Sequence, residues 1–213
     1  MKLFGYFRSS AAYRVRIALN WKGLSAEPVF IHLRKGEQAA PEFLALNPQG
    51  LVPALETDEG VLLTQSLAII EWLEETHPAP PLLPEAPNDR ARVRSIALGV
   101  ACEIHPLNNL RVLSYLRDAL GAAEDARNAW YRHWCELGLA ALEMRLAREA
   151  ATGAFCHGEA PTLADVCLVP QLANARRVDI DVAAYPTLAR IETACLALPA
   201  FAAAAPARQA DAE

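Results

Sequence analysis

The stretch Asn47-Pro-Gln-Gly-Leu-Val-Pro-Ala-Leu55 leads from a loop into a short apolar segment that is typical of a β-strand. Pro53 has no N–H and so cannot donate to a sheet ladder. A cis Val52–Pro53 bond would turn the chain sharply and leave the backbone N–H and C=O of Val52 facing outward, where a second extended peptide could pair with them. An ordinary turn is the alternative interpretation of the same residues.

A helix start follows this stretch. Gln65 and Ser66 precede an apolar run with helical spacing, residues 67–73. The first N–H groups of a helix have no partner within the helix, and they favour an anion. A strand-like backbone together with an anion site would suit a small acidic peptide, although a helix cap without a ligand explains Gln65 and Ser66 equally well.

Residues up to about 78 alternate short apolar segments with helical ones. In order, the sequence predicts a strand at 2–7, a helix at 11–22, a strand at 28–33, a short helix at 41–46, a hairpin of 53–57 and 61–64, and a helix at 66–77. The order βαβαββα is typical of a small sheet flanked by helices, as in a thioredoxin-like domain. We therefore expect a first domain at residues 1–80.

A proline-rich linker, residues 81–88, separates this domain from a second one with a different pattern. Residues 89–213 are expected to form an all-helical domain, with long helical runs at 89–120 and 123–150. The Ala- and Pro-rich tail after Phe201 is expected to fray.

A capping box marks one later helix start. Thr162 can cap the N–H of Asp165, and the Asp165 side chain can reach back to the Thr162 N–H. Pro170 lies inside the helix that this box opens, where it should kink the helix or remove one backbone hydrogen bond.

Bulk properties exclude several classes of function. The net charge is −5 without any basic block, so a nucleic-acid partner is not expected. No apolar run is long enough to span a bilayer, and residues 1–7 are too short and aromatic for a signal peptide. The five cysteines are scattered without a CxxC pair or a zinc-like spacing, so no metal site is expected. A cytoplasmic protein is the simplest interpretation.

Four motifs stand in order along the chain. They are Arg8-Ser-Ser-Ala-Ala-Tyr-Arg-Val-Arg-Ile-Ala-Leu19, Asn47–Leu55, Gln65-Ser-Leu-Ala-Ile-Ile70 and Thr162-Leu-Ala-Asp165. Together they resemble the motifs of the zeta-class glutathione transferases, a family that includes bacterial isomerases of maleylacetoacetate and maleylpyruvate. The resemblance extends to about Pro199. It implies a thioredoxin-like domain followed by an all-helical domain, a homodimer, and glutathione as cofactor.

The resemblance also implies the chemistry, which is cis–trans isomerisation of an acidic diketo-dicarboxylate. The glutathione thiolate adds to the double bond, rotation follows, and the thiolate is expelled again. Ser9 and Ser10 lie where a hydroxyl and helix N–H groups could stabilise a thiolate, although one of them could simply be an N-cap. Ala11 stands where animal and plant members usually carry Cys, so a protein thiol is not an obligatory nucleophile here.

Further residues are implied for binding glutathione, namely Ala11, Gln38, Val52, Gln65 and Ser66 from the first domain and His105, Asn109 and Arg111 from the second. For Gln38, a solvated loop residue is an equally good interpretation. For His105, glutathione contact or substrate orientation is favoured over a catalytic role.

Arginine suits a dicarboxylate substrate because its planar guanidinium grips a carboxylate with two hydrogen bonds. The resemblance selects Arg8 and Arg177 as the pair that binds the substrate carboxylates, with Arg111 third. Arg176 points about 100° away from Arg177 on the same helix. Most helical arginines are merely solvated, so this assignment depends on the resemblance.

Two other functions use the same framework. A general glutathione transferase or haloacid dehalogenase would need an apolar acceptor pocket. A non-catalytic regulatory protein on the same fold would be favoured by loss of Ser9 and Ser10 or of Gln65 and Ser66, all of which are present. The sequence does not distinguish maleylacetoacetate from maleylpyruvate, nor which serine contacts the sulfur.

Overall fold

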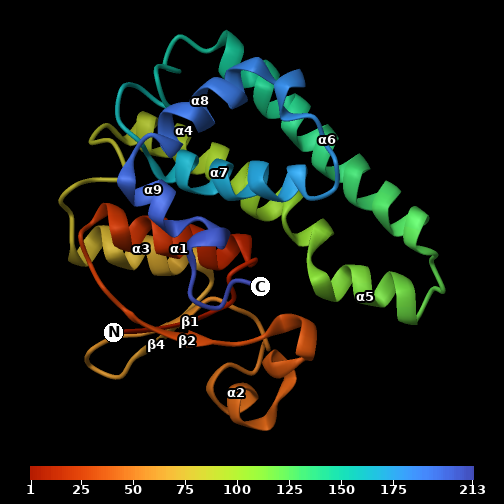
Figure 1. Ribbon diagram of the computed structural model, residues 1–213. Helices are drawn as coiled ribbons and strands as arrows, with labels where there is room; N and C mark the ends of the chain where they lie inside the picture. Colours follow the sequence, from red (N-terminus) through yellow and green to blue (C-terminus); the bar gives the residue numbers. More distant parts are fainter. The chain divides into compact units, whose positions relative to one another are not determined.

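The predicted alternation of strands and helices produces a four-stranded sheet in the first part of the chain. The computed structural model describes all of residues 1–213. The strands are β1 (Lys2–Gly5), β2 (Glu27–Phe30), β3 (Ala54–Glu56) and β4 (Leu62–Thr64), and they pair in the order β2-β1-β3-β4. β1 is parallel to β2, whereas the β1–β3 and β3–β4 pairs are antiparallel. The predicted hairpin and the order βαβαββα are confirmed (Figure 1).

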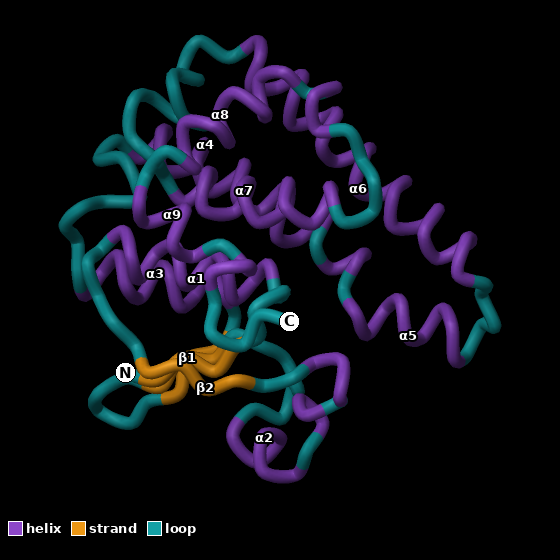
Figure 2. The backbone as a smooth tube through the Cα atoms, in the orientation of Figure 1, coloured by secondary structure: helices purple, strands orange, loops and turns teal.

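Helices cover both faces of this sheet. Figure 2 shows α1 (Ser10–Trp21) and α3 (Ser66–Thr76) on one face, with α2 (Pro41–Leu46) beyond the opposite face. The segment before α2 contains two 3-10 turns, η1 (Leu33–Lys35) and η2 (Glu37–Ala39). Phe43 of α2 joins a buried cluster with Phe4, Val52 and other apolar residues. The loop that carries Val52 is thus held by the core of this unit.

The end of the chain packs on the same unit, which comprises residues 1–82 and 196–213. It contains α9 (Pro199–Ala204) and a 3-10 turn, η6 (Pro206–Arg208). Arg16 Nε donates to the Ala204 carbonyl at 3.0 Å, and the Phe7 N–H donates to Asp211 Oδ2 at 2.9 Å. The expectation of a frayed tail is therefore wrong, because these hydrogen bonds fasten the tail. From the sequence, residues 196–213 were expected to belong to the helical domain, whereas in the structure they group with residues 1–82.

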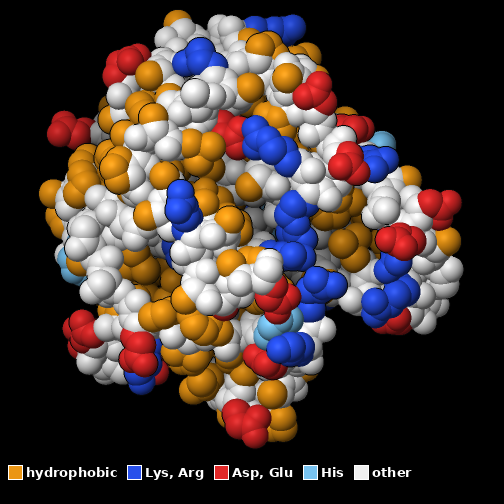
Figure 3. All heavy atoms as spheres, in the orientation of Figure 1, with side chains coloured by type: hydrophobic (Ala, Val, Ile, Leu, Met, Phe, Trp, Pro, Cys, Tyr) orange, Lys and Arg blue, Asp and Glu red, His pale blue; other side chains and the backbone are white.

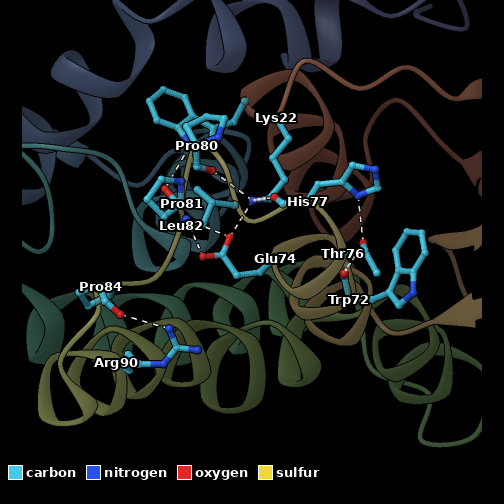
Figure 4. Close-up of polar contacts among 11 residues, drawn as sticks. Lys22, Trp72, Glu74, Thr76, His77, Pro80, Pro81, Leu82, Pro84 and Arg90 are labelled. Carbon is cyan, nitrogen blue, oxygen red and sulfur yellow. Dashed lines mark hydrogen bonds and ion pairs between the residues drawn. The ribbon is translucent and has the colours of Figure 1, made fainter.

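A buried lysine ties the ends of α1 and α3 to the proline-rich segment (Figure 4). Lys22 Nζ donates to Glu74 Oε2 at 2.7 Å and to the carbonyls of His77 and Pro80, and its side chain is 0% exposed. The Glu74 carboxylate also accepts the Leu82 N–H at 3.0 Å. A buried ammonium needs several partners to offset its lost hydration, and this one has them.

The second unit, residues 83–195, is built from helices. They are α4 (Pro87–Leu98), α5 (Leu110–Asp118), α6 (Glu124–Arg148), α7 (Leu163–Arg176) and α8 (Pro186–Leu196), with a 3-10 turn η5 (Val182–Ala184). The helical run expected over 89–120 is divided. It contains α4, a π-helical turn η3 (Gly99–Ile104), a 3-10 turn η4 (Pro106–Asn108) and α5.

Helix α7 lies at the centre of this unit, with all of residues 161–172 buried. The predicted capping box at its start is confirmed. Asp165 accepts the Thr162 N–H at 2.7 Å and the Thr162 hydroxyl at 2.8 Å, and it also accepts the Cys156 N–H at 2.8 Å. Burial raises the pKa of Asp165, and these hydrogen bonds oppose that rise. Pro170 lies inside α7, which continues past it.

The surface is mixed in character. Figure 3 shows acidic and basic side chains exposed among hydrophobic ones on the face that it draws. None of the helices combines the length and the apolar character that crossing a bilayer would require.

Candidate active site

The loop after β1 carries the two serines and opens α1. Ser9 is the N-cap, with extended backbone (φ −68°, ψ 114°), and its Oγ accepts the Ala12 N–H at 3.2 Å. Ser10 is the first helical residue and is 5% exposed, whereas Ser9 is half-buried. The hydroxyl of Ser9 thus already caps the helix, and the positive end of the helix dipole lies at both serines. Ala11 is buried beside them in the chain.

Of the two interpretations that the sequence allowed for this loop, the structure has the cis bond between Val52 and Pro53. The backbone N–H and C=O of Val52 form no hydrogen bond with another backbone group of the chain, and no side chain bonds to them. The preceding loop is fixed by Asn47, whose Nδ2 donates to the Leu51 carbonyl at 2.8 Å. Because buried backbone groups are nearly always paired, the free pair at Val52 is suited to an extended peptide.

Gln65 and Ser66 form the start of α3. Gln65 adopts a left-handed φ of 68°, which is uncommon for a residue with a side chain, and its Nε2 donates to Gln49 Oε1 at 3.0 Å. Ser66 is 7% exposed, and its Oγ accepts a hydrogen bond from Arg14 Nη1 at 3.3 Å. Positive φ values of this kind concentrate at functional sites.

Gln38 lies in η2, in a half-buried position. Its side-chain Oε1 is buried without a hydrogen-bond partner. Its backbone carbonyl closely approaches Gly50, where an added Cβ would come within 3.0 Å of the Gln38 oxygen. The solvated interpretation of Gln38 therefore does not describe its amide oxygen.

Arg8 precedes the serines and is half-buried. Its guanidinium lies over the ring of Phe7, 5.1 Å from the ring centroid. No hydrogen bond or ion pair involves its side chain, so the donors of Arg8 are available.

The two adjacent arginines at the end of α7 differ in their partners. Arg176 forms an ion pair with the buried carboxylate of Glu192 on α8 through both terminal nitrogens. Arg177 is exposed, and its Nη1 donates only to the side-chain oxygen of Asn174 at 3.3 Å. The two neighbouring arginines thus have different partners. Burial raises the pKa of the Tyr131 phenol to about 12, and the positive charge of Arg177 partly opposes this rise.

His105 directly follows the π-helical turn η3 and precedes Pro106, so irregular helix surrounds it on both sides. π-helical turns often occur at functional sites. Gly138 on α6 allows the close approach of this turn, because a Cβ there would lie 2.3 Å from Ile104 Cγ1. Sequence reasoning missed Gly138, although a lone glycine inside the helical run 123–150 was the available signal.

Asn109 and Arg111 lie at the start of α5. Asn109 is the N-cap, and its Oδ1 accepts the Arg111 N–H at 3.1 Å. Arg111 is exposed. Asn109 therefore has a structural function that accounts for it without a ligand.

Arg14 is the second residue that sequence reasoning missed. It lies inside the Arg8–Leu19 motif but was given no role there.

The buried thiols of the chain are not suited to nucleophilic catalysis. All five cysteines are free, and only Cys102 is exposed. Burial raises the pKa of Cys135 to about 11, and it also raises the pKa values of Cys156 and Cys195. A thiolate at neutral pH is therefore disfavoured at these positions.

Comparisons with known proteins agree over the whole chain. Residues 8–76 match the glutathione S-transferase N-terminal domain, and residues 128–208 match the glutathione S-transferase C-terminal domain. The chain is 53% identical over 212 residues to the probable maleylacetoacetate isomerase of Vibrio cholerae, covering 99% of this chain and 97% of that protein.

Two solved structures are similarly close. One is the holo structure of maleyl pyruvate isomerase, described as a bacterial zeta-class glutathione S-transferase, with a TM-score of 0.97 and 48% identity over 100% of both chains. The other is maleylacetoacetate isomerase from Methylobacterium extorquens AM1 with bound malonate and glutathione, with a TM-score of 0.98 and 49% identity over 100% of both chains. The chain thus belongs to the glutathione S-transferase family, in its zeta class.

Proposed function

We propose that this protein is a glutathione-dependent cis–trans isomerase that converts maleylacetoacetate to fumarylacetoacetate, or maleylpyruvate to fumarylpyruvate. The observation that carries the proposal is the unpaired backbone of Val52, in a unit that also holds the N-termini of α1 and α3. A peptide with an acidic end and a thiol matches that combination of a strand partner and anion-binding helix starts. The relative with bound glutathione and malonate supports both a peptide ligand and a dicarboxylate ligand.

The residues of the first unit fit glutathione. Val52 offers a donor and an acceptor to the peptide backbone, and Gln38 offers a buried amide oxygen without a partner. Gln65 and Ser66 would hold the carboxylate of the γ-glutamyl group at the start of α3, where the helix dipole favours negative charge. Bound glutathione supplies a thiol whose reversible addition to the alkene turns the double bond into a single bond that can rotate.

The protein's part in this chemistry is to keep the sulfur ionised and to hold the substrate. We assign thiolate stabilisation to Ser9 and Ser10, through their hydroxyl groups and the first N–H groups of α1. Because Ser9 Oγ accepts the Ala12 N–H, its own O–H proton remains available for donation. Hydrogen bonds to a charged group are worth about 1.5–3 kcal/mol, enough to lower a thiol pKa by about one to two units.

We assign the substrate carboxylates to Arg8 and Arg177, with Arg111 third. All three side chains lack an acidic partner, whereas the neighbouring Arg176 is tied to Glu192. An arginine without a carboxylate partner in its own protein is free to bind one from a ligand. His105 and Asn109 are assigned to orientation of glutathione or substrate rather than to proton transfer.

We favour maleylacetoacetate over maleylpyruvate because the chain keeps both serines of the Ser9–Ser10 pair and carries the segment Leu107-Asn-Asn-Leu110. We also propose that the protein is a cytoplasmic homodimer. Its five free cysteines suit a reducing compartment.

The matched pair Arg177→Ala and Arg176→Ala tests the function. Arg177→Ala should lower kcat/KM for isomerisation by about 100-fold, as expected for losing a bidentate carboxylate contact, while the Kd for glutathione is unchanged. Arg176→Ala should retain turnover but unfold at lower temperature, because it leaves the buried Glu192 carboxylate unpaired. Both substrates are assayed by absorbance, with and without glutathione. Equal turnover by the two variants, or isomerisation that does not need glutathione, would show the proposal to be wrong.

A further inference from the structure

We propose that Arg14 is a positioning residue, which orients the Ser66 hydroxyl and supplies the charge that holds the γ-glutamyl carboxylate of glutathione. The inference rests on the proposed function, since it takes Ser66 as the carboxylate ligand. Arg14 is a buried cation without an anionic partner in the chain.

Arg14 is 2% exposed, on the side of α1 that packs against α3. Its Nη1 donates to Ser66 Oγ at 3.3 Å, whereas its Nε and Nη2 are buried without a hydrogen-bond partner. Its side chain forms no ion pair with an Asp or Glu of the chain. A buried charge is costly unless it is paired, so this arrangement is incomplete without an anion.

The hydrogen bond to Ser66 has only one possible direction. A guanidinium donates and cannot accept, so the serine oxygen is the acceptor. The single O–H of Ser66 must then point away from Arg14. Ser66 is the first residue of α3, so its hydroxyl stands at the end of the helix that favours negative charge. An anion at this helix start would receive the O–H, the helix N–H groups and the field of Arg14 together.

Arg14 itself is covered, so it acts through Ser66 and through its charge rather than by direct contact. A charge a few ångströms from a bound anion is screened weakly when both are shielded from water. The burial of Arg14 against another helix also explains why the Arg8–Leu19 motif did not reveal this positioning role. Only packing places a residue of α1 behind a residue of α3.

Isothermal titration calorimetry with two ligands tests the proposal. One ligand is glutathione, and the other is 4-aminobutyryl-Cys-Gly, which lacks only the α-carboxylate of the γ-glutamyl group. Arg14→Met should weaken glutathione binding by about tenfold or more, as expected for losing a charge-assisted contact, and should change the Kd of the truncated ligand by less than about twofold. Ser66→Ala should show the same selectivity, and the double variant should lose less than the product of the two single effects.

Arg14→Gln is the second variant, since it keeps a donor for Ser66 but removes the charge. It should lie between the native protein and Arg14→Met for glutathione. Arg16→Met, on the same helix, is the matched control, and its effect should be the same for both ligands. Circular dichroism establishes that each variant is folded, and if Arg14→Met does not fold, Arg14→Gln decides the outcome.

Equal losses for the two ligands, or no loss for glutathione, would overturn the role of Arg14 and leave it a structural residue. That outcome differs from failure of the proposed function. In the latter case the native protein itself would fail to bind glutathione, or would bind it without isomerising either substrate.

Discussion

Replacing Asp165 by alanine removes the carboxylate that accepts hydrogen bonds from two buried backbone N–H groups. The Thr162 N–H at 2.7 Å and the Cys156 N–H at 2.8 Å would both be left unpaired, and the Thr162 hydroxyl would lose its partner. A buried donor without a partner costs about 1–3 kcal/mol, so the two backbone groups together cost about 2–6 kcal/mol. That is a large part of a typical stability of about 5–15 kcal/mol.

The expected loss of about 2–6 kcal/mol corresponds to a fall in Tm of about 4–24 °C for a chain of this size, at about 2–4 °C per kcal/mol. It is measured by thermal and urea unfolding, followed by far-ultraviolet circular dichroism. Asp125→Ala is the control, because Asp125 is exposed at the start of α6 and bonds only to the Ala126 N–H. Its loss should be below about 1 kcal/mol. If Asp165→Ala matched the control, the capping box would not hold α7 as argued.

The pH dependence adds an independent signature. Burial raises the pKa of Asp165 above its ordinary 3.8 in the folded protein. Its protonated form therefore favours the folded state, and this contribution is fully present below pH 3.8 and lost as the pH rises through the raised folded pKa. Relative to Asp165→Asn, the native protein should gain stability as the pH falls through that window. A pH-independent difference between the two would contradict the raised pKa.

Three further outcomes are expected. Lys22→Met should cost about 3–5 kcal/mol in urea unfolding because the Glu74 carboxylate loses its cationic partner, whereas the double variant Lys22→Met/Glu74→Leu should recover part of the loss; equal losses would contradict a buried pair. Gly138→Ala, despite its better helix propensity, should destabilise by about 1–3 kcal/mol because its Cβ meets Ile104 Cγ1 and Cδ1, and in thermal unfolding this cost should shrink in an Ile104→Ala background, which lacks both atoms. An equal cost in the two backgrounds would show that the loss does not come from this contact. Iodoacetamide at pH 8 should label Cys102 alone in the folded protein, as read by mass spectrometry, because the other thiols are buried; labelling of Cys135, whose pKa is raised to about 11, would contradict this.

Local features of the candidate site were predictable from sequence, because they depend on neighbouring residues. The bounds of α2, Pro41–Leu46, agree with the prediction, since Pro at its first position and the turn residues after it act within a few positions. The cis bond before Pro53 and the capping box of Thr162 and Asp165 have the same local origin. The roles of individual site residues remain predictions.

The helical half was predicted less well. Apolar spacing indicated one helix over 89–120, but the structure contains the π-helical turn η3 and the 3-10 turn η4 within that range. Spacing alone does not reveal that Ile104 must fit against Gly138 on another helix. The tail was expected to fray, because an alanine-rich segment carries little local signal of the residues it packs on.

What the amino-acid sequence determined by itself was the kind and order of the elements, the two patterns of the two halves, and the position of several helix starts. Tertiary structure alone decided which strands pair, that Arg176 is tied to Glu192 while Arg177 is not, and that Arg14 is buried against Ser66. The physical reason is the range of the interactions. Propensities, caps and turns act over a few residues, whereas burial and hydrogen bonding between distant segments exist only after the chain has closed its long loops and packed its core.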